Sequence, residues 1–197
     1  MKEIQISHLY MAYKDKPVLE DFSMTLPQGS TTCLMAPSGS GKTTLLRILM
    51  GLEHPQKGTV TGMDGLKISA VFQEDRLCRG LNAVSNIRLV SPRLTPDMVR
   101  KQMAAVGLSG CESQPVEELS GGMKRRVAIL RGLLADWDIL FLDEPFAGLD
   151  LDTKSKVMAY TRRICENRTV LFVTHDADEA AAIGAGQILS PSFRDEN

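Results

Sequence analysis

Two segments of the chain carry the residue types needed to bind a nucleotide. Residues 36–43 read Ala-Pro-Ser-Gly-Ser-Gly-Lys-Thr, and residues 139–144 form an apolar run that ends in Asp143 and Glu144. In the first segment, glycines allow a tight turn whose backbone N–H groups point at phosphate oxygens, while Lys42 reaches the outer phosphates and the Thr43 hydroxyl ligates Mg²⁺. In the second, two carboxylates follow a strand, at the edge of an α/β sheet where ligands collect. The two segments together predict a nucleotide–Mg²⁺ site.

The phosphate-binding segment departs from the usual pattern at one position. Ala36 replaces the first glycine of the pattern G-x-x-x-x-G-K-[ST]. An alanine held at positive φ would cost about 1–2 kcal/mol, so either the backbone is ordinary there or the loop is slightly strained. The residues expected to bind the phosphates are Pro37, Ser38, Gly39, Ser40, Gly41, Lys42, Thr43 and Thr44.

The segments around these residues have the patterns of strands and helices in an α/β core. Near the N-terminus apolar and polar residues alternate, as they do in half-buried strands. Two later runs are continuously apolar, which is typical of parallel strands buried on both faces. The expected strands are 4–6, 22–26, 31–35, 69–72, 139–142 and 169–173, and the expected helices of the core are 41–50 and 178–183.

Between residues 81 and 119 the strand pattern is replaced by helical signals. Thr95 and Pro96 form a helix start, with a capping hydroxyl followed by proline at the first helical position. The apolar stripe that follows ends at Gly107, and Ser120 is placed to cap the next helix. We therefore expect a helical insertion between the two halves of the nucleotide site.

The sequence Leu-Ser-Gly-Gly at 119–122, lying between these two halves, resembles the signature of the ABC ATPases, and the likeness extends from about Ile4 to Ser190. The resemblance implies a P-loop NTPase sheet core with an N-terminal antiparallel β lobe and a helical insertion. Residues 1–80 and 137–197 would form the catalytic core with its β lobe, and 81–136 the helical subdomain. In this family the signature acts on the ATP of a second protomer. Ser120, Gly121 and Gly122 are thus expected to bind the partner's ATP.

The same resemblance assigns roles to single residues. Asp143 would hold Mg²⁺ through its water shell, and Glu144 would polarise the attacking water. Gln73 would contact the metal or water and connect the site to the helical insertion, and His175 would contact the γ-phosphate and Glu144. Two further residues would contact the nucleotide or link the two sites across the dimer: Tyr13, by stacking on adenine, and Asp150, in the loop that follows Glu144.

Charge and cysteine content exclude other kinds of site. The net charge of −1 carries no electrostatic footprint for nucleic acid. The basic run Lys124-Arg125-Arg126 is interpreted as the charged outer face of the signature helix rather than as a nucleic-acid patch. The four cysteines form no C-x-x-C pair, which argues against zinc and a disulfide framework, and no apolar run approaches the ~18 residues of a membrane span.

The resemblance implies ATP hydrolysis with Mg²⁺ that drives a membrane permease. Phe146 and the stretch 72–77 resemble importers of the nitrate, sulfonate and taurine kind. The expected partners are a second ATPase subunit, a permease and an external solute-binding protein, with the chain in the cytoplasm on the inner face of the cell membrane. Alternatives are a soluble ABC-type ATPase not coupled to transport and an exporter ATPase; a P-loop small-molecule kinase would lack the signature.

A docking site for the permease is expected beside the segment that follows Gln73. Leu77, Cys78, Leu81 and Val84 are apolar residues in a stretch with no strand or helix period to bury them. Exposed apolar clusters usually mark partner sites. The expected site is a shallow groove lined by these side chains; the alternative is that they pack onto the core of the helical insertion.

Overall fold

A parallel sheet of five strands runs through the middle of the protein. The computed structural model describes residues 3–14, 16–37 and 39–190. Every pairing within this sheet is parallel, and β6 and β7 are buried along their whole length, as expected for strands covered on both faces. In the order of pairing, the strands are β5 (Ile68–Val71), β6 (Ile139–Asp143), β7 (Thr169–Thr174), β3 (Thr31–Met35) and β8 (Gln187–Leu189).

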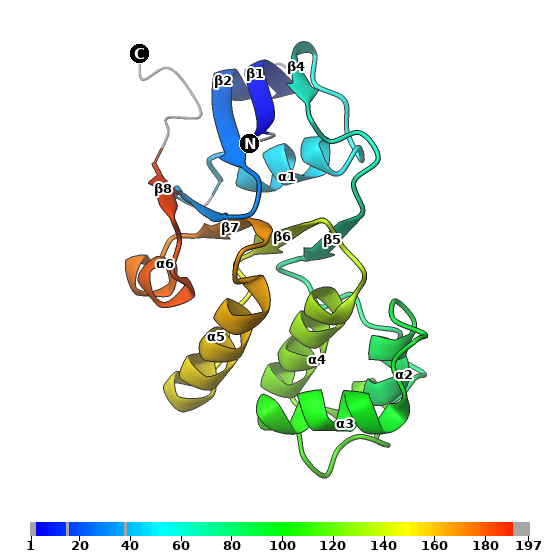
Figure 1. Ribbon diagram of the computed structural model, residues 1–197. Helices are drawn as coiled ribbons and strands as arrows, with labels where there is room; N and C mark the ends of the chain where they lie inside the picture. Colours follow the sequence, from blue (N-terminus) through cyan, green and yellow to red (C-terminus); the bar gives the residue numbers. More distant parts are fainter. Residues whose placement is uncertain (1–2, 15, 38, 191–197) are drawn as a thin grey trace.

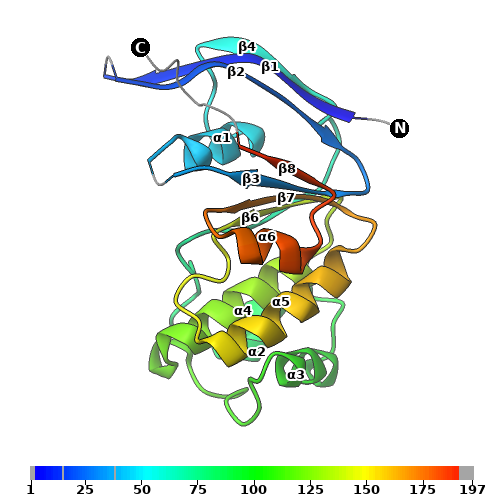
Figure 2. The ribbon, with the colours of Figure 1, turned by 90° about the vertical axis from the view of Figure 1, so that its left-hand side faces the viewer.

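An antiparallel sheet of three strands lies above the parallel one in Figure 1. Its order is β2 (Lys16–Pro27), β1 (Glu3–Tyr13) and β4 (Lys57–Thr61). Helix α1 (Lys42–Leu49) lies between the two sheets, as Figure 2 shows. The apolar side chains of α1 join those of both sheets in one buried cluster. The start of α1, where the phosphate loop ends, is therefore held between two sheets.

The opposite face of the parallel sheet is covered by helices (Figures 1 and 2). Four of the helical elements come between β5 and β6 in the chain, and the other two follow β6 and β7. Their apolar side chains form a second buried cluster with the lower face of the sheet. They are α2 (Ala83–Arg88), α3 (Pro96–Ala105), the short 3-10 helix η1 (Val116–Glu118), α4 (Gly121–Leu134), α5 (Leu151–Cys165) and α6 (Ala177–Ile183).

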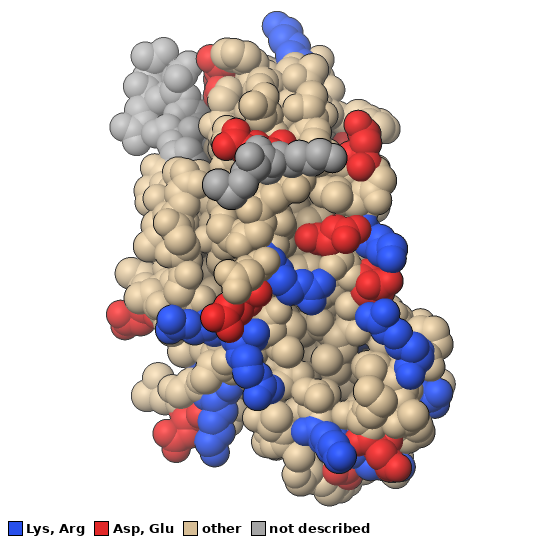
Figure 3. Space-filling model, viewed as in Figure 1, with Lys and Arg blue, Asp and Glu red and all other residues tan. Residues whose placement is uncertain are grey.

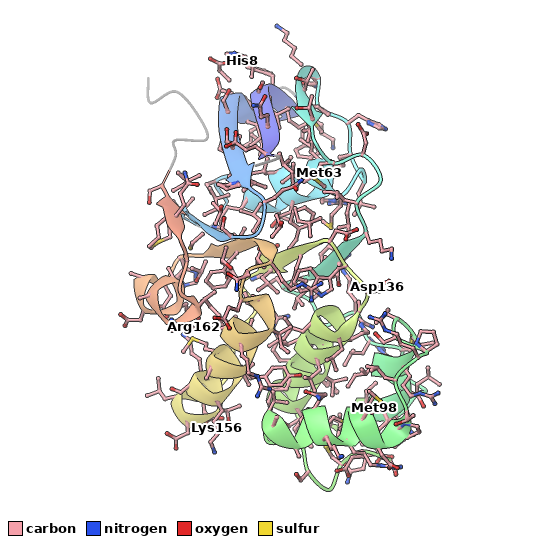
Figure 4. The ribbon with its side chains drawn as sticks, viewed as in Figure 1. His8, Met63, Met98, Asp136, Lys156 and Arg162 are labelled. Carbon is pink, nitrogen blue, oxygen red and sulfur yellow. The ribbon has the colours of Figure 1, made fainter. Side chains whose placement is uncertain are left out.

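The parallel sheet separates the two buried clusters, because successive side chains of a strand point to opposite faces. In β6, Ile139 and Phe141 belong to the cluster with α1, while Leu140 and Leu142 belong to the cluster with the other helices. Figure 4 shows side chains filling the space on both sides of the sheet. A continuously apolar strand is needed where both faces are covered.

Capping residues start the helices where the sequence predicts. The Thr95 hydroxyl accepts a hydrogen bond from the backbone N–H of Met98 at 3.3 Å, with Pro96 as the first helical residue. The Ser120 hydroxyl accepts one from Met123 at the same distance and caps α4. These bonds satisfy N–H groups that have no partner within the helix.

The expected fold class is confirmed: a parallel P-loop NTPase-like core, an antiparallel N-terminal sheet and helices. Strands β4 and β8 and helix α5 were not expected, and the boundaries of the helical subdomain at 81 and 136 stay a prediction.

On the face seen in Figure 3, basic and acidic side chains are interspersed over the helical region. None of the helices in the described residues is long and apolar enough to cross a membrane.

Candidate active site

The phosphate loop has a backbone that only glycine accommodates at its junction with α1. Gly41, which precedes the helix, has a φ of 107°, and a Cβ there would lie 2.7 Å from the carbonyl oxygen of Val18. Ala36 is not among the described residues with positive φ, so alanine at this position is unstrained. The Ser40 hydroxyl is buried without a hydrogen-bond partner among the described residues, which fits a loop that receives a phosphate. Ser38 lies outside the described residues.

The ammonium group of Lys42 lies at the centre of the site. It donates to the carbonyl oxygens of Ala36 and Pro37, each at 2.7 Å, and lies 3.9 Å from a carboxylate oxygen of Glu144. The Lys42 side chain is 6% exposed, so its charge is largely shielded from water. A buried cation held between a phosphate loop and a carboxylate is suited to bind the outer phosphates of a nucleotide.

Two oxygen donors suited to a magnesium ion meet across the site. The Thr43 hydroxyl donates to a carboxylate oxygen of Asp143 at 3.2 Å. Burial raises the pKa of Asp143, which the hydrogen bond from Thr43 partly opposes. Hydroxyl and carboxylate oxygens are ligands that Mg²⁺ prefers. A divalent cation would also stabilise the charged form of this buried carboxylate, so the donor set fits the expected metal.

Glu144 turns toward the same pocket because its backbone leaves the β conformation. Its φ is 44°, in the left-handed region that few side chains adopt. Without this turn, adjacent residues of β6 would point to opposite faces. One Glu144 carboxylate oxygen instead lies 3.4 Å from Nδ1 of His175, at the end of β7, and 3.9 Å from Lys42. The structure thus brings Asp143, Glu144 and His175 together at the carboxyl edge of the sheet.

Asp143 and Glu144 line one pocket, which also receives Gln73 from the segment after β5; His175 contacts Glu144 but is not among the lining residues. Gln73 is exposed, whereas Asp143 is only 5% exposed. The position of the pocket at the carboxyl ends of β3, β5 and β6 agrees with the usual site of α/β sheets. Its volume is about 290 Å³, and it is lined by Val18, Gly39, Gly41, Lys42, Thr43, Thr44, Gln73, Asp143 and Glu144.

Tyr13 lies at the end of β1, beside the start of α1. Its side chain is 42% exposed, and its hydroxyl donates to a carboxylate oxygen of Glu53. Burial and this carboxylate raise the pKa of Tyr13, while the Thr44 side chain opposes the rise. An exposed aromatic ring next to a phosphate-loop residue is placed to contact a base; the stacking on adenine stays a prediction.

The signature residues do not line the pocket of their own chain. Ser120, Gly121 and Gly122 lie at the N-terminal end of α4, which in Figure 2 is on the same side of the molecule as the start of α1 but on the opposite side of the parallel sheet. Asp150 caps α5 by accepting from the backbone N–H of Thr153 at 3.0 Å. Hydrogen bonding with Thr153, chiefly this bond, lowers the pKa of Asp150.

The similarity of this chain to known proteins shows which family it belongs to. The sequence profile of the ABC transporter family matches residues 19–147. The aliphatic sulfonates import ATP-binding protein SsuB 1 of Rhodococcus jostii is 41% identical over 87% of this chain and 72% of its own length. A protein of the same name from Pseudomonas aeruginosa is 38% identical (90% of this chain, 77% of its own), and the taurine import ATP-binding protein TauB of Escherichia coli is 34% identical (94% and 78%).

This chain belongs to the ABC transporter ATP-binding proteins. It is therefore an ATPase that uses ATP with Mg²⁺, as the resemblance implies. The expected likeness to importers of the sulfonate and taurine group is confirmed by the names of the relatives.

Arg125 of the signature helix is buried, although the charge pattern predicts that it is exposed. The interpretation of Lys124-Arg125-Arg126 as a charged outer face is wrong for Arg125, which is only 4% exposed. Its guanidinium donates to backbone carbonyls of two segments that flank the ATP pocket. The signal that could have found it is helical spacing, since Arg125 shares a face with the buried Ala128, Ile129 and Gly132.

Proposed function

We propose that this ATPase supplies the energy for importing a small organosulfonate, such as taurine or an aliphatic sulfonate. The observation that carries the proposal is the similarity to sulfonate and taurine import proteins along nearly the whole chain. The pocket supports the ATPase part of the proposal, since groups suited to bind phosphate and a metal ion lie together with the Glu144 carboxylate. The cargo itself is handled by other subunits of such a system.

In the proposed mechanism, each pocket residue acts on a different part of the nucleotide. Lys42 and the backbone of the phosphate loop bind the phosphates, and the helix dipole of α1 favours their negative charge. Thr43, Asp143 and Gln73 would hold Mg²⁺, which would neutralise charge on the outer phosphates. Glu144 orients the attacking water, and His175, 3.4 Å from Glu144, contacts the γ-phosphate.

The proposed catalytic unit contains two protomers. Ser120, Gly121 and Gly122 are at the exposed end of α4, where their backbone groups and the helix dipole can bind the γ-phosphate of a nucleotide held by another chain. A Cβ at Gly122 would lie 3.7 Å from the side chain of Leu149, so the loop that ends at Asp150 lies beside the signature. Each chain then contributes half of each site.

The proposed partners are a second copy of the ATPase, a transmembrane permease and an external solute-binding protein. The relatives are named as import ATP-binding proteins, and such a protein needs a separate subunit to form the path across the membrane. We accordingly place the chain in the cytoplasm, on the inner face of the cell membrane. No role in binding nucleic acid is proposed.

The groove proposed for the permease is more polar than the sequence predicts. Of the four residues expected to line it, only Leu77 does so. Val84 is buried at 8% exposure in the core of the helical region, and Cys78 and Leu81 are exposed but do not line the groove. Leu77 is half-buried against the same core. The groove has a volume of about 450 Å³ and is lined by Asp75, Arg76, Leu77, Arg79, Val116, Glu117 and Lys124.

The Cys78 thiol provides a direct test of this docking surface. It is the exposed one of the four cysteines, since Cys33, Cys111 and Cys165 are buried. We expect a thiol-reactive crosslinker added to the co-purified complex to join Cys78 to the permease. The matched control moves the thiol to another exposed position of the helical region, in the double variant Cys78→Ser, Ser109→Cys. Efficient crosslinking from position 109 but not from position 78 would contradict the proposed groove.

The solute assignment is tested by coupling ATP hydrolysis to the external binding protein. The ATPase, its permease and the binding protein are reconstituted in vesicles with ATP and Mg²⁺. We expect taurine or a short alkanesulfonate to raise the rate of ATP hydrolysis, whereas inorganic sulfate and the carboxylate analogue β-alanine do not. Stimulation by the carboxylate but not by the sulfonates would overturn the assignment while leaving the ATPase function intact.

A further inference from the structure

Arg125 of α4 is a buried arginine with hydrogen bonds to an unusual number of backbone carbonyls. Its side chain is 5% exposed, and its nearest carboxylate is that of Asp75, at 3.4 Å. Burial lowers the pKa of Arg125, an effect that Asp75 opposes. A buried guanidinium is costly unless its donors are satisfied. Here backbone carbonyls satisfy most of them, so the side chain is tied to the paths of the segments that supply those carbonyls.

The first of these segments follows β5 and contains Gln73. One terminal nitrogen of Arg125 donates to the carbonyl of Phe72 and, at 3.1 Å, to the carbonyl of Gln73 itself. Arg131 of the same helix binds the next part of this segment, by donating to the carbonyls of Asp75 and Arg76. The position of Gln73 at the pocket therefore depends on α4.

The second segment follows β6 and contains Glu144. The other terminal nitrogen of Arg125 lies 3.3 Å from the carbonyl of Asp143 and 2.8 Å from that of Glu144, and Nε donates to the carbonyl of Pro145 at 2.7 Å. Three consecutive carbonyls thus bind one guanidinium. They surround the residue whose φ of 44° turns its carboxylate into the pocket.

The planar guanidinium fixes the two segments relative to each other. Its donors diverge in a rigid fork, so one side chain can bind carbonyls on two sides at set angles. Arg125 also lies in the first half of α4, the helix that Ser120 caps. A single side chain therefore connects the start of the signature helix with the backbones of Gln73 and Glu144.

We propose that Arg125 is a positioning residue that holds Gln73 and Glu144 in register with the signature helix, so that a shift of α4 moves both sides of the pocket together. The inference rests on the proposed function, in which Gln73 and Glu144 act on metal and water. Its consequence is specific. A signature helix engaged with the partner's ATP sets the catalytic geometry of its own chain.

The substitution that tests this role is Arg125→Lys, which keeps the buried positive charge. A lysine ammonium is a single point of charge and cannot span both segments as the guanidinium does. We expect kcat for ATP hydrolysis to fall by about 10- to 100-fold, the effect of misplacing reacting groups by a fraction of an ångström to 1 Å. The affinity for ATP, measured by fluorescence titration without Mg²⁺, should not change, because Arg125 makes no hydrogen bond to the described part of the phosphate loop.

Arg168→Lys is the matched control, since it makes the same chemical change at the amino ends of the strands, away from the pocket at their carboxyl ends. Arg168 is half-buried, donates to the carbonyl of Trp137, and lies just before β7. This variant is expected to lose some thermal stability and to keep its kcat. A wild-type kcat in a folded Arg125→Lys protein, or an equal loss in both variants, would overturn the proposal.

Hydrogen–deuterium exchange tests whether Arg125 connects the segments of Gln73 and Glu144, and it needs no ATP hydrolysis. In the full chain, Arg125→Lys should speed amide exchange in residues 72–76 and 143–147 together, with no change in residues 95–107. Faster exchange in one segment alone, or throughout the chain, would show that Arg125 does not couple the two. If both segments loosen while kcat is unchanged, the roles given to Gln73 and Glu144 are wrong, and the catalytic part of the proposal falls with them.

Discussion

Replacing Glu144 with glutamine is expected to leave ATP binding intact and to lower the rate of hydrolysis by about 10²–10⁴-fold. The side chain keeps its shape but loses the charge that, in the proposed mechanism, polarises the attacking water. We assign this task to Glu144 because the Asp143 carboxylate is bonded to Thr43, whereas the left-handed backbone of Glu144 turns a second carboxylate into the pocket. Nucleotide titration and a phosphate-release assay on the same preparation measure the two effects separately.

The control for Glu144→Gln is Glu166→Gln. Glu166 is exposed at the C-terminal end of α5 and does not line the pocket, so the same chemical change there should have no effect on either measurement. If Glu144→Gln retained nearly wild-type turnover in a preparation free of contaminating ATPases, the role of Glu144 in hydrolysis would have to be given up. Loss of ATP binding in step with turnover would instead make Glu144 a binding residue.

Ser120→Arg is expected to abolish hydrolysis without weakening the binding of ATP to its own chain. Ser120 is exposed at the start of α4 and does not line the pocket of its own chain. An arginine there would block the approach of a partner's nucleotide. The substitution also removes the helix cap, at a cost of about 0.5–2 kcal/mol. Thermal unfolding must therefore show a folded protein, and Ser109→Arg, on an exposed turn, serves as the control for added bulk and charge.

Mixing two inactive chains distinguishes a split site from simple destabilisation. A Lys42→Ala chain lacks its own phosphate-binding ammonium but keeps a normal signature. Paired with Ser120→Arg, it forms heterodimers with one complete site, so about a quarter of all sites should recover after random pairing. Recovery from two dead proteins has no explanation within a single chain. If the purified wild-type monomer hydrolysed ATP at full rate regardless of its concentration, the two-protomer site would be refuted.

Helix starts and buried strands could be predicted from the sequence, because capping residues and apolar runs act over a few neighbouring residues. The hydroxyls of Thr95 and Ser120 start helices because each satisfies an N–H group a few residues away. The apolar run 139–142 is a central strand because the sheet is covered on both faces. The sequence also places Gln73, Asp143 and His175 at or just after the ends of strands, where the structure has them, whereas their roles come from the resemblance to the ABC ATPases and stay predictions.

Features that depend on distant segments could not be predicted in this way. Strand β4 has a single half-buried residue, Val60, and is a strand because it pairs with β1. Val84 is buried because the helices of the insertion pack around it. Arg125 is buried because carbonyls from the ends of β5 and β6 converge on it, and a charge pattern within one helix contains no information about them.

The left-handed backbone at Glu144 has a consequence for engineering this protein. A glutamate in that conformation is disfavoured by about 1–2 kcal/mol, whereas glycine and asparagine adopt it readily. A selection for heat resistance alone would therefore favour glycine or asparagine at the position proposed to activate water, and the expected products are more stable proteins that no longer hydrolyse ATP. Directed evolution of this subunit needs a selection in which survival depends on transport, so that each gain in melting temperature is found at some other position.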